Sequence, residues 1–357
     1  MMERWIVASG LTAVVYLAWG SHQIQHRTIE TAEGFAKRTP GGTTLERTVR
    51  LLAVGDINLG RSVGQSILKG DTLYPFVAVV DTFKHYDIVF ANLECTLSNQ
   101  NGETQHPRNE LIFTGPPEGA IALRNAGIHV VSTANNHALD YGVKAHGETM
   151  ENLTNAGVRF VGTAGESTAL FEPLIVLHNT LRIAFFACTD IMNITHPLWK
   201  RYVAEADTAK LLPRIRAHRD EVDYIIVSYH GGEEYADRPT RRTKEFARAV
   251  VSSGADLFLG HHPHVSYGVE EINGRLIVYS LGNFVFRQFT PLWTQRSFAF
   301  AVEIVKTSDG TRARRFSCLP VLCGVQPRFV SSGDDARTML ERIKRLSSQI
   351  VSEQLSW

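Results

Sequence analysis

Short apolar runs alternate with amphipathic stretches from Val49 onward, as expected of a chain that forms strands and helices in turn. The runs that predict strands are 50–54, 87–91, 128–133, 159–162, 174–178, 181–187, 223–229, 257–260, 269–272, 276–280, 298–305 and 312–321. The stretches that predict helices are 73–85, 116–126, 140–156, 209–219, 241–253 and 334–353. This alternation predicts an α/β fold.

Three short polar breaks in this pattern predict β-hairpins. They are Asn179-Thr180, Asn273-Gly274 and Ser308-Asp309-Gly310, each between two apolar runs. Asn-Gly is a strong signal for a two-residue hairpin turn, because both positions tolerate positive φ. Strands joined by hairpins are antiparallel, whereas strands joined by helices are parallel. The chain therefore predicts mixed sheets.

The N-terminal segment Trp5–Gly20 contains sixteen residues without a charge. Its length lies between the apolar core of a cleaved signal peptide, about 7–15 residues, and a full membrane span of about 20 residues. We expect residues 1–22 to form an uncleaved signal-anchor, so that a single-pass protein carries its main domain outside the cytoplasm at the cell membrane. Two alternatives stay open: a cleaved signal peptide, which would give a secreted protein, and a buried helix of the core.

The rest of the chain divides into three parts. Residues 23–48 are polar and predict a linker, residues 49–330 carry the alternating pattern and predict one domain, and residues 331–357 contain the predicted C-terminal helix.

Composition and charge narrow the function classes. The chain has 357 residues, of which 44% are hydrophobic and 20% charged, with a net charge of +1. Nucleic-acid-binding proteins usually carry a basic excess, so we expect no nucleic-acid partner. The four cysteines form no CxxC pair, which argues against a cysteine-ligated zinc site. Cys318 and Cys323 could form a disulfide or stay free, and the sequence leaves both open.

Five of the predicted strands end in side chains that can bind metal. In α/β sheets, ligands gather at the carboxyl ends of the strands. Each residue alone has an ordinary explanation, such as a turn or a helix N-cap, but five coincidences of this kind predict a shared metal centre. The residues are Asp56 and Asn58, Asn92 and Glu94, Asn136 and His137, His230, and finally His262 and His264.

The last of these strand ends is the most informative stretch of the chain. An apolar run ends at Gly260, and three histidines follow within four residues: His261, His262 and His264. His262 and His264 are two positions apart, so in an extended segment their side chains point to the same side. Pro263 stiffens the backbone between them. We therefore expect His262 and His264 to act together as metal ligands.

Six motifs in this order carry a resemblance to a known family. They are GDINLGR at 55–61, ANLE at 91–94, STANNHALDYG at 132–142, HGGEEY at 230–235, GHHPHV at 260–265 and YSLGNFVF at 279–286. The set resembles the calcineurin-like metallophosphatases, and more closely their branch of CapA/PgsA-type capsule synthesis proteins of poly-γ-glutamate biosynthesis. The resemblance covers about residues 50–290, with all motifs in order. It implies a four-layer sandwich of two mixed β-sheets flanked by helices.

The resemblance also implies a role for each motif residue around two divalent metal ions, which would be Mn, Fe or Zn. Asp56 would bind the first ion, Glu94 would bridge both, and His264 would return to the first. Asn136, His230 and His262 would bind the second. His137 would be the acid or electrostatic group near the leaving oxygen. Asn58 and Asn92 would be weaker ligands or substrate contacts, and Arg61 is a further weak candidate for substrate contact.

This chain departs from the general phosphatase pattern at two positions. Asn58 stands two residues after the first Asp, where a histidine is usual, and Glu94 stands where the bridging group is usually Asp. Late in the chain, we interpret Asn283 after Gly282 as a turn residue.

By function, the resemblance implies a membrane-anchored, extracytoplasmic metal-dependent hydrolase or transferase of capsule or poly-γ-glutamate biosynthesis. Its partners would be an anionic polymer or phosphate substrate, the membrane through the N-terminal helix, and subunits of a polymer synthase. Two alternatives are a phosphoesterase on an unrelated phosphate and a non-catalytic accessory subunit of a membrane polymer synthase.

Overall fold

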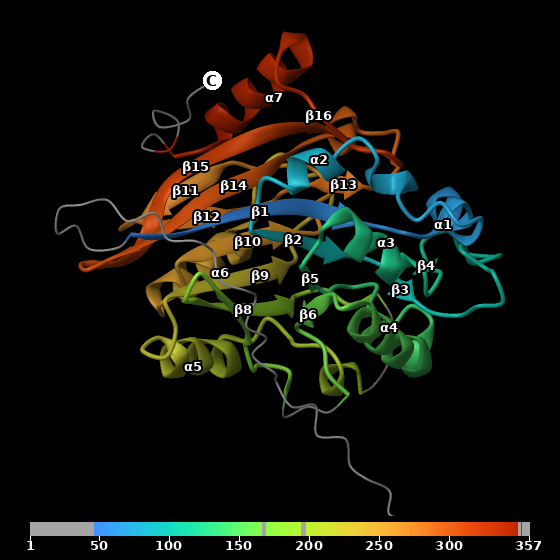
Figure 1. Ribbon diagram of the computed structural model, residues 1–357, viewed down its shortest axis with the longest axis horizontal. Coiled ribbons are helices and arrows are strands. Elements are labelled where there is room, and N and C mark those ends of the chain that lie inside the picture. Colours follow the sequence, from blue (N-terminus) through green and yellow to red (C-terminus); the bar gives the residue numbers. More distant parts are fainter. Residues whose placement is uncertain (1–45, 166–168, 194–197, 349–350, 352–357) are drawn as a thin grey trace, which may run out of the picture.

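The computed structural model describes residues 46–165, 169–193, 198–348 and 351 of the chain. The predicted signal-anchor, residues 1–22, and nearly all of the predicted linker lie outside the described residues. Among the helices that are described, none has the length and apolar character needed to cross a membrane. The described residues form two large sheets with helices around them (Figure 1).

The first sheet has the strand order β16-β15-β14-β1-β2-β5-β6, with β13 also paired to β1. Strands β2, β5 and β6 continue it from β1 in parallel on one side. On the other side lie β14, β15 and β16, each antiparallel to its neighbour, and β13, which pairs in parallel with the end of β1. The bounds are β1 (Arg47–Ile57), β2 (Ile88–Leu93), β5 (Val130–Ser132), β6 (Arg159–Val161), β13 (Asn283–Val285), β14 (Arg296–Thr307), β15 (Gly310–Leu322) and β16 (Arg328–Phe329).

The second sheet has the order β11-β12-β10-β9-β8-β7. Its four central strands are parallel, and each edge strand pairs antiparallel with its neighbour. The bounds are β7 (Leu174–His178), β8 (Leu181–Thr189), β9 (Tyr224–His230), β10 (Leu257–His261), β11 (Val269–Ile272) and β12 (Arg275–Val278). A small separate sheet joins β3 (Thr96–Leu97) to β4 (Thr114–Gly115). Both large sheets are mixed, as predicted.

Helices cover the outer face of each sheet. Helices α1 (Arg61–Leu68), α2 (Val80–Phe83), α3 (Gly119–Ala126) and α4 (Gly142–Ala156) pack on the first sheet. Helices α5 (Thr208–His218) and α6 (Arg241–Ser252) pack on the second. Helix α7 (Gly333–Leu346) lies across β14 and β15, at the top of Figure 1. Short 3₁₀ turns among the described residues include η1 (Tyr74–Phe76), η3 (Trp199–Arg201) and η4 (Leu292–Gln295).

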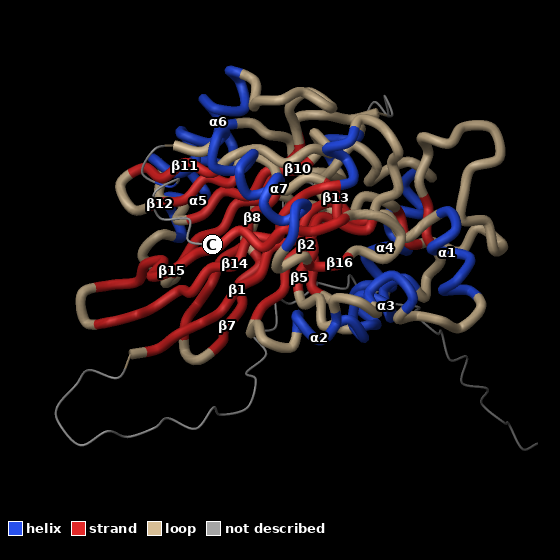
Figure 2. The backbone as a smooth tube through the Cα atoms, turned by 90° about the horizontal axis from the view of Figure 1, so that it is seen from above, coloured by secondary structure: helices blue, strands red, loops and turns tan. Residues whose placement is uncertain are grey.

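The two sheets pack face to face around a shared apolar core. Along β1, Leu51 and Ala53 face the other sheet, whereas Leu52 and Val54 face the helices, because successive strand residues point to opposite sides. The rings of Phe90 and Phe185, one from each sheet, stack at 5.7 Å in this core. Figure 2 shows the strands in the middle of the molecule, with α6 on one side and α2 and α3 on the other. The layers are helix, sheet, sheet and helix, which confirms the predicted sandwich.

Local predictions differ from the structure in a few places. All three predicted hairpins form, and Asn273 and Gly274 have φ of 51° and 77° in the turn between β11 and β12. The predicted helix 73–85 is wrong as one element, since only η1 and the single turn α2 form there. Helix α1 was not predicted. All four cysteines are free thiols, so Cys318 and Cys323 form no disulfide in the described structure.

Candidate metal centre

The predicted site residues lie at the carboxyl ends of parallel strands, at the place where these strand ends of the two sheets meet. In the first sheet, Asp56 of β1 lies opposite Asn92 of β2. In the second sheet, His230 of β9 lies opposite His261 of β10. Parallel neighbouring strands place their ends at the same edge, so residues far apart in sequence become neighbours in space. The site is therefore a product of the topology and not of one local motif.

Two groups of buried side chains each bring their ligand atoms close together. Glu94, His230 and His262 form one group, and Asp56, Glu94 and His264 form the other, with the ligand atoms of each within 4.8 Å of one another. Glu94 belongs to both groups, which is the geometry required of a carboxylate that bridges two ions. The arrangement brings together five of the six residues predicted as metal ligands, and their action as ligands stays a prediction.

Several polar atoms at this point are buried without a hydrogen-bond partner in the described structure. They are both carboxylate oxygens of Glu94, Oδ2 of Asp56 and Nδ1 of His262. A buried polar atom that lacks a partner costs free energy, so such atoms are rare outside functional sites. Oxygen and imidazole ligands without thiolate suit Mn, Fe or Zn. The donor set therefore fits divalent cations.

The sixth predicted ligand, Asn136, lies beside the first group. Its amide Oδ1 is 2.7 Å from Nε2 of His230, and the same nitrogen is 3.8 Å from Oε1 of Glu94. An amide oxygen at this place can complete the coordination of an ion held by His230, Glu94 and His262. Asn136 thus lies where the resemblance predicted it.

Asn92 links the two ligand groups from behind. It is fully buried, its Nδ2 donates to Oδ1 of Asp56 at 2.9 Å, and the same nitrogen lies 3.2 Å from Nδ1 of His230. Asn135 in turn donates to Oδ1 of Asn92 at 3.2 Å. Partners of this kind fix the orientation of metal ligands. The contacts of Asn92 are thus those of a residue that orients Asp56 and His230, and its contact with substrate stays a prediction.

Asn283 holds His264 in the same way. Its Oδ1 is 2.9 Å from Nδ1 of His264, while Nε2 of that ring faces Oε1 of Glu94 at 3.9 Å. Our interpretation of Asn283 as a turn residue was wrong, because it begins β13 and lies opposite Asp56 in the sheet. The sequence signal was present, since Asn283 lies within the YSLGNFVF motif, but its partner His264 could not be read from the spacing.

His261 is a further buried histidine that our site prediction did not include. Its Nδ1 lies 3.2 Å from Oδ1 of Asp56. Neither ring nitrogen forms a well-aligned hydrogen bond with any described residue. It belongs to neither ligand group. His261 therefore packs directly against a candidate ligand.

His137 has the contacts expected of an acid or electrostatic group. Its Nδ1 is 2.6 Å from Oδ2 of Asp140, which also accepts a hydrogen bond from the backbone N–H of Phe113 at 2.6 Å. Its Nε2 faces the site, 3.8 Å from Oε1 of Glu94 and 3.3 Å from Nδ2 of Asn193. Asp140 was missed in the sequence, although the spacing NHALD after a strand end places it one helical turn from His137.

The remaining two candidates lie at the margin of the site. Asn58 is buried, and its Oδ1 accepts a hydrogen bond from the N–H of Gly60 at 2.8 Å, as in an Asx turn. Arg61 donates to the carbonyl of Glu110 at 2.7 Å, and its guanidinium lies 5.0 Å from the ring centroid of Phe113. Phe113 stacks on His137 at 3.9 Å. Their roles toward a substrate stay predictions.

Burial and charge set the protonation of the candidate ligands. Burial lowers the pKa of His262 to about 3, and burial with the neighbouring charge of His262 lowers the pKa of His230 well below its ordinary value. Burial alone would raise the pKa of Asp56, but its contacts with His261 and His264 outweigh burial and hold this pKa well below the usual range. Burial and then Asp56 raise the pKa of Glu94 well above its ordinary value. Metal binding should therefore release a proton from Glu94.

We expect the metal-free protein to lose stability as the pH falls from about 6.5 to about 3. In this window the unfolded chain protonates His262 and the folded protein does not, so acid favours unfolding, by an amount on the order of a few kcal/mol. Denaturant unfolding in the presence of chelator, as a function of pH, measures this dependence.

The variant His262→Gln should reduce the pH slope of the unfolding free energy by about one proton. The raised pKa of Glu94 has the opposite effect on the unfolding free energy, at pH values above the ordinary pKa of a glutamate. The parent and the variant both contain Glu94, so this effect cancels when their slopes are compared. An unchanged slope in His262→Gln would contradict the assignment.

Two glycines allow the strand ends to approach each other. A Cβ atom at Gly55 would lie 1.9 Å from the carbonyl oxygen of Gly282, and one at Gly260 would lie 2.0 Å from that of Tyr279. Both obstacles are backbone atoms, so no side chain can move aside. The backbone contact next to Asp56 therefore depends on glycine.

Gly55→Ala should lower the free energy of unfolding by about 1–3 kcal/mol, because β1 and β13 must separate to accept the methyl group. Chemical denaturation measures the change. Gly147→Ala is the matched control, since it lies in α4 with no atom within 4 Å of the new Cβ. We expect that control to be neutral or stabilising. A Gly55→Ala protein as stable as the parent would show that the segments can separate without cost.

Known proteins resemble this chain over most of its length. The family model described as "Bacterial capsule synthesis protein PGA_cap" matches residues 50–288. The PGA biosynthesis protein CapA of Bacillus subtilis is 33% identical over 274 residues, which cover 75% of this chain and 70% of that protein. The capsule biosynthesis protein CapA of Bacillus anthracis is 30% identical over 304 residues, or 83% and 73% of the two chains.

Among solved structures, a phosphatase of Mycoplasma pneumoniae aligns with a TM-score of 0.46 at 14% identity. The alignment covers 77% of this chain and 94% of that one.

Proposed function

The chain belongs to the bacterial capsule synthesis protein family PGA_cap, and on that premise we propose that it is a metal-dependent hydrolase or transferase acting on an anionic capsule polymer such as poly-γ-glutamate. The observation that carries the proposal is the pair of buried ligand groups that share Glu94. A protein without a metal-dependent role would have little physical reason to bury these carboxylates and imidazoles together while both oxygens of Glu94 lack a hydrogen-bond partner.

The side chains divide the work of such a site. Asp56 and His264 would hold one divalent ion, His230, His262 and Asn136 the other, and Glu94 both. When bound, two such ions activate a water molecule and neutralise charge on the attacked group. Asn92 and Asn283 would keep the ligands in orientation through their hydrogen bonds.

His137 would supply the proton that the leaving group needs. Asp140 holds its Nδ1, so that Nε2 faces the metal centre. In its doubly protonated form, with Nδ1–H bonded to the Asp140 carboxylate, such a histidine can donate the Nε2 proton to a leaving oxygen or nitrogen and is left as the neutral imidazole. The site could therefore cleave a phosphoester or an amide.

The proposal includes the location of the protein. Residues 1–22 would anchor the chain in the cell membrane and leave the metal centre on the outer face, next to the subunits of a polymer synthase. The supports for this part are the uncharged segment Trp5–Gly20 and the family itself.

Metal content of the full-length protein, purified without chelators and measured by plasma mass spectrometry, tests the proposal first. We expect about two equivalents of Mn, Fe or Zn per chain. The loaded protein would then be assayed for shortening of poly-γ-glutamate and for hydrolysis of a set of phosphoesters. If the protein cleaves phosphoesters but does not shorten poly-γ-glutamate, its substrate is a phosphate compound and not the polymer. Near-zero metal that added ions do not restore would favour a non-catalytic accessory subunit.

A further inference from the structure

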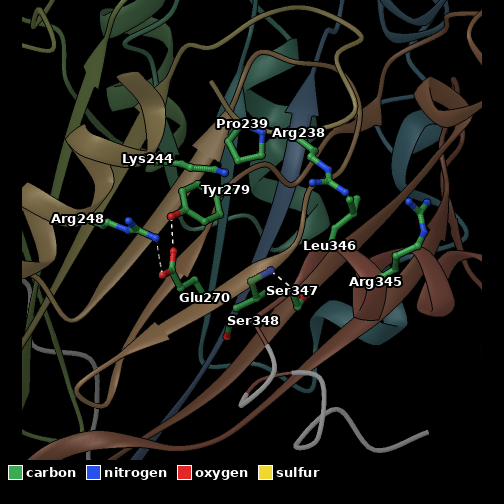
Figure 3. A pocket seen from close by; sticks show the side chains of 11 residues that line it. Arg238, Pro239, Lys244, Arg248, Glu270, Tyr279, Arg345, Leu346, Ser347 and Ser348 are labelled. Carbon is green, nitrogen blue, oxygen red and sulfur yellow. Dashed lines mark hydrogen bonds and ion pairs between the residues drawn. The ribbon is translucent and has the colours of Figure 1, made fainter. Parts of the chain in front are cut away.

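A second pocket lies outside the metal centre. It has a volume of about 310 Å³, and none of the candidate metal ligands lines it. Four segments far apart in sequence form it: the loop after β9, helix α6, the hairpin of β11 and β12 with the residue that follows it, and the end of α7 (Figure 3). The volume is at the lower end of the range for small-ligand sites.

The pocket is lined by four cationic side chains and a single carboxylate. The carboxylate, Glu270, already has two partners, since Arg248 donates to it at 2.9 Å and the Tyr279 hydroxyl donates to its other oxygen (Figure 3). Arg238, Lys244 and Arg345 have no ion pair or side-chain hydrogen bond within the part of the chain that the structure describes. The lining thus keeps three uncompensated positive charges.

These charges are not the solvated face of a single helix. Only Lys244 and Arg248 share an element, on successive turns of α6, whereas Arg238 comes from the preceding loop and Arg345 from the end of α7. Folding brings like charges together from separate segments, which is unfavourable unless an anion binds between them. The ligand that fits must therefore carry more than one negative charge.

We propose that this pocket binds carboxylate groups of an acidic polymer chain, as an anion subsite in addition to the metal centre. The guanidinium groups of Arg238 and Arg345 match carboxylates in a bidentate geometry, and Lys244 adds a point charge. The naming of the polymer rests on the proposed function, whereas the charge of the ligand rests on the pocket alone.

Two short segments connect the pocket to the metal centre. One runs from His230, a candidate ligand, to Arg238, and the other from Tyr279 in the pocket to Asn283, which holds His264. A polymer that contacts both places would bind more tightly than at either one, because the second contact becomes intramolecular.

The test uses full-length protein and a fluorescently labelled γ-linked oligoglutamate, with binding followed by fluorescence anisotropy. The double variant Arg238→Gln/Arg345→Gln should weaken binding by about tenfold or more. The matched control is Arg312→Gln/Arg315→Gln, which removes two exposed charges from β15. It should change the affinity by less than about twofold, because exposed charges that do not contact the ligand are screened by salt. Equal losses in both variants, or no loss in either, would overturn the proposal.

Two further measurements distinguish this inference from the proposed catalytic function and from binding of phosphate. The effect of the double variant is measured again in a His262→Ala background, where it should persist even if the metal centre proves inactive. Failure of the catalytic proposal would then leave the subsite standing. Competition with inorganic phosphate identifies the anion: we expect unlabelled oligoglutamate to displace the probe and phosphate at equal charge concentration to leave it bound. Displacement by phosphate would overturn the carboxylate assignment.

Discussion

Replacing His262 with alanine is expected to remove about one metal ion per chain. His262 is one of three side chains in the ligand group that also contains Glu94 and His230. Even residues that only orient ligands change metal affinity by about 10–100-fold when mutated, so the loss of a direct ligand should cost more. Hydrolytic activity should fall by about a thousandfold or more, since metal assistance supplies several kcal/mol of transition-state stabilisation.

Plasma mass spectrometry of the variant and the parent, purified together, measures this loss. His146→Ala is the matched control, because His146 is as buried as His262, at 3% exposure each, and belongs to neither ligand group. The control should keep its full metal content. Full metal content in His262→Ala would contradict the site, and equal loss in both variants would point to a general structural defect.

The location of the metal centre could be predicted because it depends on a rule of topology. Parallel strands of one sheet end at a common edge, so pairing brings Asp56 close to Glu94 and His230 close to His262, and the packing of the two sheets joins these pairs. The alternating pattern predicted an α/β fold with mixed sheets, whereas the four-layer arrangement was implied by the family resemblance. Neither inference needed the exact register of any strand.

The residues that orient the ligands could not be predicted, because their partners are set by three-dimensional packing. Asn283 follows Gly282 and has the sequence context of a turn, yet it bonds to His264 from a strand beside β1. His261 stands in the motif with the other histidines and contacts Asp56, yet it is a member of neither ligand group. A sequence pattern identifies the type of such a residue and leaves its direction open.

Short elements were the other weak point, since two turns of helix carry little periodicity. Helix α1 has only Val63 and Ile67 as large apolar residues on its buried face, within eight residues that include Gly64. The segment 73–85 contains enough apolar residues for a helix, but Pro75 lies in η1 and the continuous pattern breaks into two turns. Packing under the sheet, and not intrinsic helix propensity, sets both outcomes.

Replacing His137 with asparagine is expected to lower the turnover rate by about 10²–10⁴-fold, which is the usual contribution of a positioned general acid. Its Nε2 faces Glu94 and its Nδ1 is held by Asp140, so the ring can deliver a proton at the centre. His137 belongs to neither ligand group, and metal content should therefore stay at the parent level. Asp140→Asn should produce a similar loss, because the amide lacks the negative charge that stabilises a protonated imidazole and can turn its NH2 group toward Nδ1.

The leaving group distinguishes proton donation from a purely structural role of His137. For a phosphoester with a 4-nitrophenolate leaving group, which needs no proton to depart, the loss in His137→Asn should be much smaller than for an alkyl ester. The same comparison applies to Asp140→Asn, whereas Tyr141→Phe, at the next residue along the chain, should behave as the parent with both esters. An equal loss with both esters would mean that His137 stabilises charge and does not donate a proton, and a loss of metal would mean that it acts as a ligand. The imidazole of His137 contacts two carboxylates, Asp140 at 2.6 Å through Nδ1 and Glu94 at 3.8 Å through Nε2. The closer contact should fix the ring and leave Glu94 free to bind metal.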